Sequence, residues 1–93
     1  AELPQYYMSK NKITLTPELD IDGLLAAMEE KYKHENHTTI DGLKIDFEKE
    51  WVHLRKSNTE PIIRIYSESN SINTAENIAK KMISDINEII KTL

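Results

Sequence analysis

The sequence predicts an α+β domain in which an antiparallel four-stranded sheet carries two helices on one face. Hydrophobic residues recur with a period of two through the middle of the chain, and with the period of a helix in one segment before it and one after it. Short turns join the middle segments, and short connections favour antiparallel neighbours. A chain of 93 residues has room for one such domain, so residues 1–93 are predicted to be a single unit.

The first predicted elements are a short strand and a helix. Residues 12–15 alternate in hydrophobicity, which is typical of a strand. Thr16 can cap the following helix, with Pro17 at its first position, and one apolar stripe continues to about Lys33.

The start of this helix has an alternative. Gly23 lowers the helix propensity of the segment by about 1 kcal/mol, so the helix can instead begin at Asp20 or Asp22. Residues 34–37 are polar and are predicted to form a break before the sheet.

Three segments with a period of two follow the break, and they supply the other strands. They cover residues 39–47, 51–55 and 62–67. The first is interrupted by Asp41-Gly42, a dipeptide that favours tight hairpin turns. Apolar side chains alternate with polar ones, so one face of the sheet is predicted to be core and the other to face water.

The last predicted element is a long amphipathic helix. Asn73 and Glu76 have the spacing of a capping box, in which two side chains satisfy free backbone N–H groups. An apolar stripe follows from Ile78 to Leu93 and is predicted to pack on the sheet.

The charge of the chain argues against a nucleic-acid partner. Twelve Lys and Arg against 16 Asp and Glu give a net charge of -4, which repels a polyanion. A nucleic-acid-binding sheet needs a basic, aromatic face, and the sequence offers only Arg55, Lys56 and Arg64 in one cluster. We therefore predict that no nucleic acid binds.

Composition also bears on location and stability. No apolar run approaches the roughly 20 residues of a membrane span, so no membrane partner is expected. The chain has no cysteine, so hydrophobic packing without disulfides must hold the fold. These features predict a cytoplasmic protein.

One cluster of residues near the end of the first helix suggests a metal site. It consists of Glu30, His34 and His37, but three such residues without a fixed fourth ligand are typical of a solvated helix end. Carboxylates on the turns and on the polar strand face are read as wet surface. The sequence therefore assigns no metal ligand and no catalytic residue.

The chemically informative stretch is Arg-Lys-Ser-Asn-Thr-Glu-Pro at residues 55–61, between two predicted strands. Arg55 offers a planar fork for two charge-assisted hydrogen bonds. Ser57, Asn58 and Thr59 add donors, so a loop of this type can wrap a phosphate. The simpler interpretation is a tight turn, because Ser, Asn and Thr side chains often bond their own backbone.

This stretch resembles the phosphate-binding loop of the α-D-phosphohexomutase superfamily, the phosphoglucomutase and phosphomannomutase enzymes. The resemblance covers nearly all of the chain. Its other landmarks are Leu3-Pro4, Tyr6-Tyr7, residues 41–47, Trp51-Val52, residues 63–66 and Ala75-Glu76. One departure is Lys56, where many members carry proline.

The resemblance implies that this chain is the fourth, C-terminal domain of such an enzyme, with a fold similar to the TATA-box-binding protein. In the family this domain grips the phosphate that is not being transferred, which assigns Arg55, Ser57, Asn58 and Thr59 to substrate phosphate binding. The other three domains supply an active-site phosphoserine, a loop that holds Mg²⁺ and a loop that reads the sugar. This domain is expected to need no cofactor of its own and to be inactive alone.

The substrate implied by the resemblance is a hexose 1-phosphate or hexose 6-phosphate. Asn58, in place of Gly, favours the glucose and mannose branch over phosphoglucosamine mutase. Two other classes of function stay open. A stand-alone interaction module differs from the mutase domain in whether the coding sequence continues upstream into the three other domains. A nucleic-acid-binding domain of the same fold would need the basic, aromatic sheet face.

Overall fold

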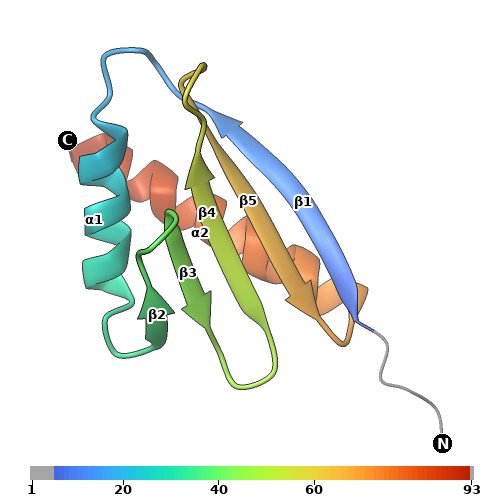
Figure 1. Ribbon diagram of the computed structural model, residues 1–93. Coiled ribbons are helices and arrows are strands. Elements are labelled where there is room, and N and C mark those ends of the chain that lie inside the picture. Colours follow the sequence, from blue (N-terminus) through green and yellow to red (C-terminus); the bar gives the residue numbers. More distant parts are fainter. Residues whose placement is uncertain (1–5, 93) are drawn as a thin grey trace, which may run out of the picture.

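The computed structural model describes residues 6–92 and shows two helices with a five-stranded antiparallel sheet (Figure 1). The elements are β1 (Tyr7–Thr14), α1 (Ile21–Lys31), β2 (Asn36–Thr38), β3 (Leu43–Asp46), β4 (Trp51–Lys56), β5 (Ile62–Ser69) and α2 (Ile72–Thr92). The strand order is β1-β5-β4-β3-β2. The predicted α+β class is confirmed.

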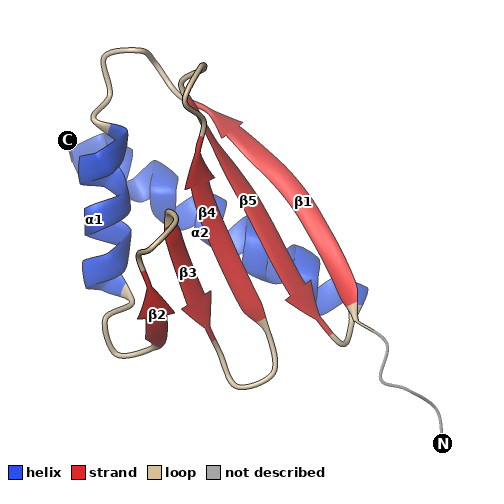
Figure 2. Cartoon of the chain, in the orientation of Figure 1, coloured by secondary structure: helices blue, strands red, loops and turns tan. Residues whose placement is uncertain are grey.

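One face of the sheet forms the core. Alternate residues of β3, β4 and β5 are buried, and they join apolar residues of both helices in one hydrophobic cluster. In Figure 2, α2 crosses behind the sheet and α1 lies beside its β2 edge, while the near face carries no helix within residues 6–92. The predicted division into a core face and a wet face is therefore confirmed.

The prediction of four strands is wrong, because Asn36–Thr38 forms β2 in place of the expected polar break. β2 pairs with β3, where His37 lies opposite Ile45. Its three residues are polar and mostly exposed, so the strand lacks the apolar alternation that marks a strand in a sequence. Pairing with the well-buried β3 determines its conformation.

α1 begins at Ile21, as in the alternative start at Asp20, and not at Thr16. The Asp20 Oδ1 atom accepts a hydrogen bond of 3.0 Å from the backbone N–H of Gly23, which makes Asp20 the N-cap. Gly23 permits this close cap, because a Cβ atom there would lie 2.6 Å from the Asp20 carboxylate. Thr16 instead accepts a turn hydrogen bond from the N–H of Leu19 at 3.1 Å.

α2 begins at Ile72, so the predicted capping box at Asn73 is wrong. The backbone N–H of Ala75 donates to the carbonyl of Ser71 at 3.0 Å, which places Asn73 inside the first turn. The predicted apolar stripe is confirmed at Ala79, Met82 and Ile86, which are buried, and Ala75, which precedes the predicted stripe, is buried as well. Three residues with predicted roles, Leu3, Pro4 and Leu93, lie outside the described residues.

A polar contact joins the two helices beside the core. The Tyr32 hydroxyl donates to Oδ2 of Asp85, and Lys31 Nζ lies 3.4 Å from Oδ1 of the same carboxylate. Burial and this acceptor raise the pKa of Tyr32 well above its usual range, so the hydroxyl keeps its proton and remains a donor.

Within residues 6–92, no helix combines the length and the apolarity needed to span a bilayer.

Candidate functional site

The loop between β4 and β5 is a tight turn organised by Ser57. The Ser57 backbone N–H donates to the carbonyl of Ile62 at 3.1 Å and closes the loop. The Ser57 Oγ atom accepts from the backbone N–H groups of Thr59 and Glu60, both at 3.3 Å, and lies 3.3 Å from Thr59 Oγ1. The turn interpretation thus describes the internal bonding of Ser57.

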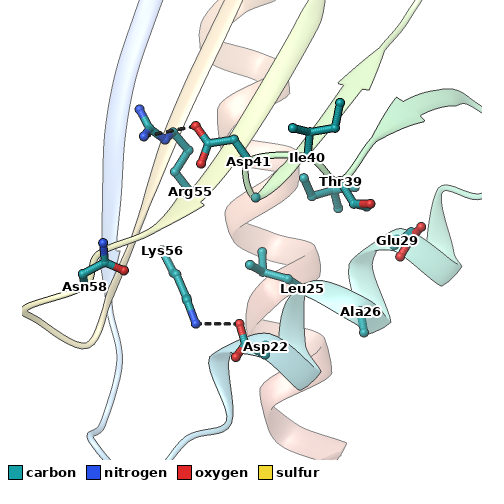
Figure 3. Close-up of a pocket in the computed structure, with 12 residues that line it drawn as sticks. Asp22, Leu25, Ala26, Glu29, Thr39, Ile40, Asp41, Arg55, Lys56 and Asn58 are labelled. Carbon is teal, nitrogen blue, oxygen red and sulfur yellow. Dashed lines mark hydrogen bonds and ion pairs between the residues drawn. The ribbon is translucent and has the colours of Figure 1, made fainter.

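Arg55 and Lys56 flank the entrance to this loop and point to opposite faces of the sheet, because successive strand residues alternate. Each cation meets a carboxylate from another part of the fold (Figure 3). Arg55 Nη2 lies 3.2 Å from Asp41 Oδ2, and Lys56 Nζ lies 2.8 Å from Asp22 Oδ1. All four side chains are at least two-fifths exposed, so each ion pair is screened and weak.

The position of Asp41 is fixed by the turn between β2 and β3. Gly42 has a φ of 75° and packs on β4 so closely that a Cβ atom there would lie 2.2 Å from the carbonyl oxygen of Leu54. His53 Nε2 donates a hydrogen bond to the Asp41 carbonyl. These contacts bring the Asp41 carboxylate over β4 and beside Arg55.

A cavity of about 370 Å³ opens between this turn, the start of the loop and α1 (Figure 3). Arg55, Lys56 and Asn58 line it, whereas Ser57 and Thr59 do not. The facing wall comes from α1 and from the turn, and it consists of Asp22, Leu25, Ala26, Glu29, Thr39, Ile40, Asp41, Gly42 and Leu43. Of the four residues predicted to bind phosphate, the structure thus places Arg55 and Asn58 at this open cavity.

Sequence reasoning missed the carboxylates that face Arg55 and Lys56. The Asp41-Gly42 dipeptide predicted a turn, and the turn is present. The sequence does not show that this turn packs against β4. The link from Lys56 to Asp22 joins residues 34 positions apart. Pairs this distant in sequence depend on how the helix packs on the sheet, which local patterns do not specify.

The cavity brings together two cations, an amide side chain and three carboxylates, those of Asp22, Glu29 and Asp41. Guanidinium, ammonium and amide groups are the kinds of group that recognise phosphate or carboxylate. Among residues 6–92, no group of three or more His, Cys, Asp and Glu side chains gathers in a way that could hold a metal ion. His37 instead bridges the Glu35 carbonyl, 2.8 Å from Nδ1, and the Glu29 carboxylate, 3.1 Å from Nε2.

Comparison with known proteins relates the whole fold to one family. Residues 12–84 match the family model described as the phosphoglucomutase/phosphomannomutase C-terminal domain. The chain is 36% identical over 96% of its length to a phosphoglucosamine/phosphogalactosamine mutase of Sulfurisphaera tokodaii, and covers 19% of that protein. It is 40% identical over 97% of its length to a phosphoglucomutase/phosphomannomutase of Thermococcus kodakarensis, and covers 20% of it.

A third relative is a probable phosphoglucosamine mutase of Pyrococcus horikoshii. It is 30% identical to this chain over 99% of the chain's length, and the match covers 21% of that protein. The chain therefore spans about a fifth of the length of the curated relatives it matches. Two of these three proteins are named as phosphoglucosamine mutases, so the glucose and mannose branch predicted from Asn58 stays a prediction.

Proposed function

Because this chain belongs to the phosphoglucomutase/phosphomannomutase C-terminal domain family, we propose that it grips the substrate phosphate in a phosphohexomutase. The observation that carries the proposal is the placement of Arg55, Lys56 and Asn58 around one open cavity at the β4–β5 loop. We set the substrate at the level of hexose phosphate, which fits the names of all three relatives. The proposed reaction interconverts the 1-phosphate and the 6-phosphate.

The chemistry of the loop suits a phosphate that is held and not transferred. Arg55 can place two parallel N–H groups on two phosphate oxygens, while Lys56 adds charge without fixed geometry. The Asn58 amide side chain adds single hydrogen bonds. None of these groups is a nucleophile or a general base, so the loop binds the anion and leaves it chemically unchanged.

A loop that reads only phosphate serves a mutase in a specific way. An intermediate with a phosphate at each end must be gripped by either end as it turns around, and both ends present the same anion. Recognition of the sugar by this loop would favour one orientation over the other. We therefore assign selection among sugars to the rest of the parent enzyme.

The remaining chemistry belongs, in this proposal, to other parts of the parent. A phosphoserine and Mg²⁺ there would supply the transferred phosphoryl group and neutralise its charge. The contribution of this chain is to hold the far phosphate and, by closing on the substrate, to exclude water from the reactive centre.

The proposal is tested by titrating the ¹⁵N-labelled 93-residue chain with glucose 6-phosphate and, separately, with glucosamine 6-phosphate. Binding is expected near the millimolar range, about 4 kcal/mol, because the rest of the site is absent. The largest amide shifts should fall on residues 55–60 and be the same for both sugars. Arg55→Ala should remove them, while Lys44→Ala on the sheet face should not. A silent loop at tens of millimolar ligand would refute the phosphate site.

A further inference from the structure

The open face of the sheet carries positive charge that the fold does not neutralise. Paired residues of neighbouring antiparallel strands share a face, and the register places Lys12 opposite Arg64 and Arg64 opposite Arg55. One cross-strand row over β1, β5 and β4 therefore consists of three exposed cations. Lys10 lies in the next row, opposite Tyr66. Like charges directly opposite each other destabilise a sheet, and Asp41 offsets only the Arg55 end of this row.

The cations nearer the β2 edge already have partners, and those over β1 and β5 do not. Lys44 lies 3.6 Å from Asp46 and Arg55 lies 3.2 Å from Asp41. In the described part of the chain, Lys10, Lys12 and Arg64 form no ion pair. A hollow of about 290 Å³ lies over them, lined by Lys10, Asn11, Lys12, Arg64 and Tyr66.

We propose that this cationic face, defined by Lys10, Lys12 and Arg64, docks an acidic surface on another part of the parent enzyme. The chain spans about a fifth of its relatives, so a covalently linked partner four times its size is expected nearby. Linkage keeps such a partner at high effective concentration, so a few screened ion pairs are enough to bias its position. The row also continues into Arg55, so a docked surface lies next to the proposed phosphate site.

A nucleic acid is a poorer match to this face than an acidic protein surface. Stacking with bases requires open aromatic rings. The Trp51 ring is covered by Lys44, whose Nζ lies 5.2 Å from the ring centroid, and Tyr66 is only partly exposed. The net charge of -4 also repels a long polyanion, whereas an acidic patch brings only local charge.

Zero-length coupling of lysine amines to carboxylates in the full-length parent enzyme, followed by mass spectrometry, tests the docking directly. Lys10 or Lys12 should couple to an Asp or Glu outside residues 1–93. Coupling only within this chain, or none at either lysine while other lysines react, would overturn the proposal. So would micromolar binding of a 20-nucleotide single strand to the 93-residue chain at physiological salt, with shifts on this face.

Charge reversal gives an independent readout. The pair Lys10→Glu and Lys12→Glu should lower kcat/KM of the parent roughly 3- to 30-fold, because opposed like charges weaken docking. The pair Lys49→Glu and Lys91→Glu makes the same change in net charge on exposed lysines away from the row, and should have little effect. Equal losses from both pairs would contradict a specific docking face. This docking proposal depends on membership of the family and not on phosphate binding by the loop. A failed phosphate titration would therefore refute the phosphate site without refuting the docking face.

Discussion

Arg55 lies near the end of β4 and places a planar guanidinium beside the β4–β5 loop. Removal of one partner of a close charge pair costs on the order of 2 to 5 kcal/mol, so Arg55→Ala in the parent enzyme should lower kcat/KM by roughly 30-fold to several thousand-fold. Arg55→Lys should recover part of the loss, because it keeps the charge without the fork. Steady-state kinetics measure both variants. Equal activity of Arg55→Lys and the wild type would show that bidentate geometry is not used.

In the proposed site, Asp41 would compete with phosphate for Arg55, so removal of its charge should strengthen phosphate binding. The pair is exposed and separated by 3.2 Å, so its loss should cost the fold less than about 1 kcal/mol. Asp41→Asn keeps the shape of the turn but removes the competing charge. Phosphate should therefore bind the 93-residue variant about 2- to 5-fold more tightly, since the resident pair is worth no more than about 1 kcal/mol. Weaker binding in the same NMR titration would mean that Asp41 chiefly orients Arg55.

His37 links β2 to the end of α1, and its two hydrogen bonds make the link dependent on pH. Nδ1 must donate to the Glu35 carbonyl, and Nε2 faces the Glu29 carboxylate, so both bonds are fully made only when the ring is protonated. The carbonyl bond first, and the Glu29 contact after it, raise the pKa of His37 above its usual 6.5.

A raised pKa in the folded state stabilises the fold below the unfolded pKa, and the contribution disappears as pH rises through the folded value. The melting temperature should therefore fall between pH 6 and pH 8 in the wild type. His37→Gln should flatten that slope, while His34→Gln, which alters an exposed histidine, should not. A slope that survives His37→Gln would assign the titration to another group.

The contact between α1 and α2 is tested at Tyr32. Tyr32→Phe removes a donor from the mostly buried Asp85 carboxylate, whose side chain is 13% exposed, and leaves Lys31 as its partner. The free energy of unfolding should fall by about 1.5 to 3 kcal/mol, the usual range for a lost hydrogen bond to a charged group. Tyr66→Phe, on the open sheet face, is the control and should change stability by less than about 0.5 kcal/mol. Urea unfolding distinguishes the two.

Elements with strong periodic patterns were predictable, and elements that depend on neighbours were not. β4, β5 and α2 bury a regular set of side chains, and their patterns predicted them. β2 is three polar residues long and exists because β3 supplies a partner. α1 follows the alternative cap Asp20 and not Thr16, and α2 begins before the predicted cap Asn73, since several polar residues near each start can act as a cap. Among the site residues, the loop was recognisable from the sequence of residues 55–61. The carboxylates Asp22 and Asp41, which pair with Lys56 and Arg55, could be found only from the tertiary fold.

The whole chain is expected to fold alone and to lack mutase activity. Its core cluster draws on both helices and all the strands that face them, and within residues 6–92 no buried side-chain nitrogen or oxygen lacks a hydrogen-bond partner. The purified 93-residue chain should unfold in one cooperative thermal transition. Glucose 1-phosphate should remain unconverted in its presence. Measurable conversion would place the chemistry in this chain and contradict the proposed division of labour.

The similarity to the TATA-box-binding protein remains a prediction at this scale. The β4–β5 loop lies at one end of the sheet (Figure 1). The strand register places the row of Arg55, Arg64 and Lys12 beside that loop, across β4, β5 and β1. Substrate phosphate and a docked acidic surface would therefore act on adjacent residues. The two proposals can be separated, because Lys10 and Lys12 lie on β1, outside the loop.

The ion pairs of Arg55 and Lys56 have a consequence for discrimination among small ions. Each cation starts with a carboxylate as its resident counterion, so any incoming anion must exchange with that carboxylate and not simply fill an empty positive site. Chloride has a single charge and no fork-shaped set of acceptors, so it gains little from the exchange. A phosphate dianion brings twice the charge and several oxygens in the geometry of the guanidinium. In the proposed site, this exchange would favour sugar phosphates over the abundant monovalent salt of a cell.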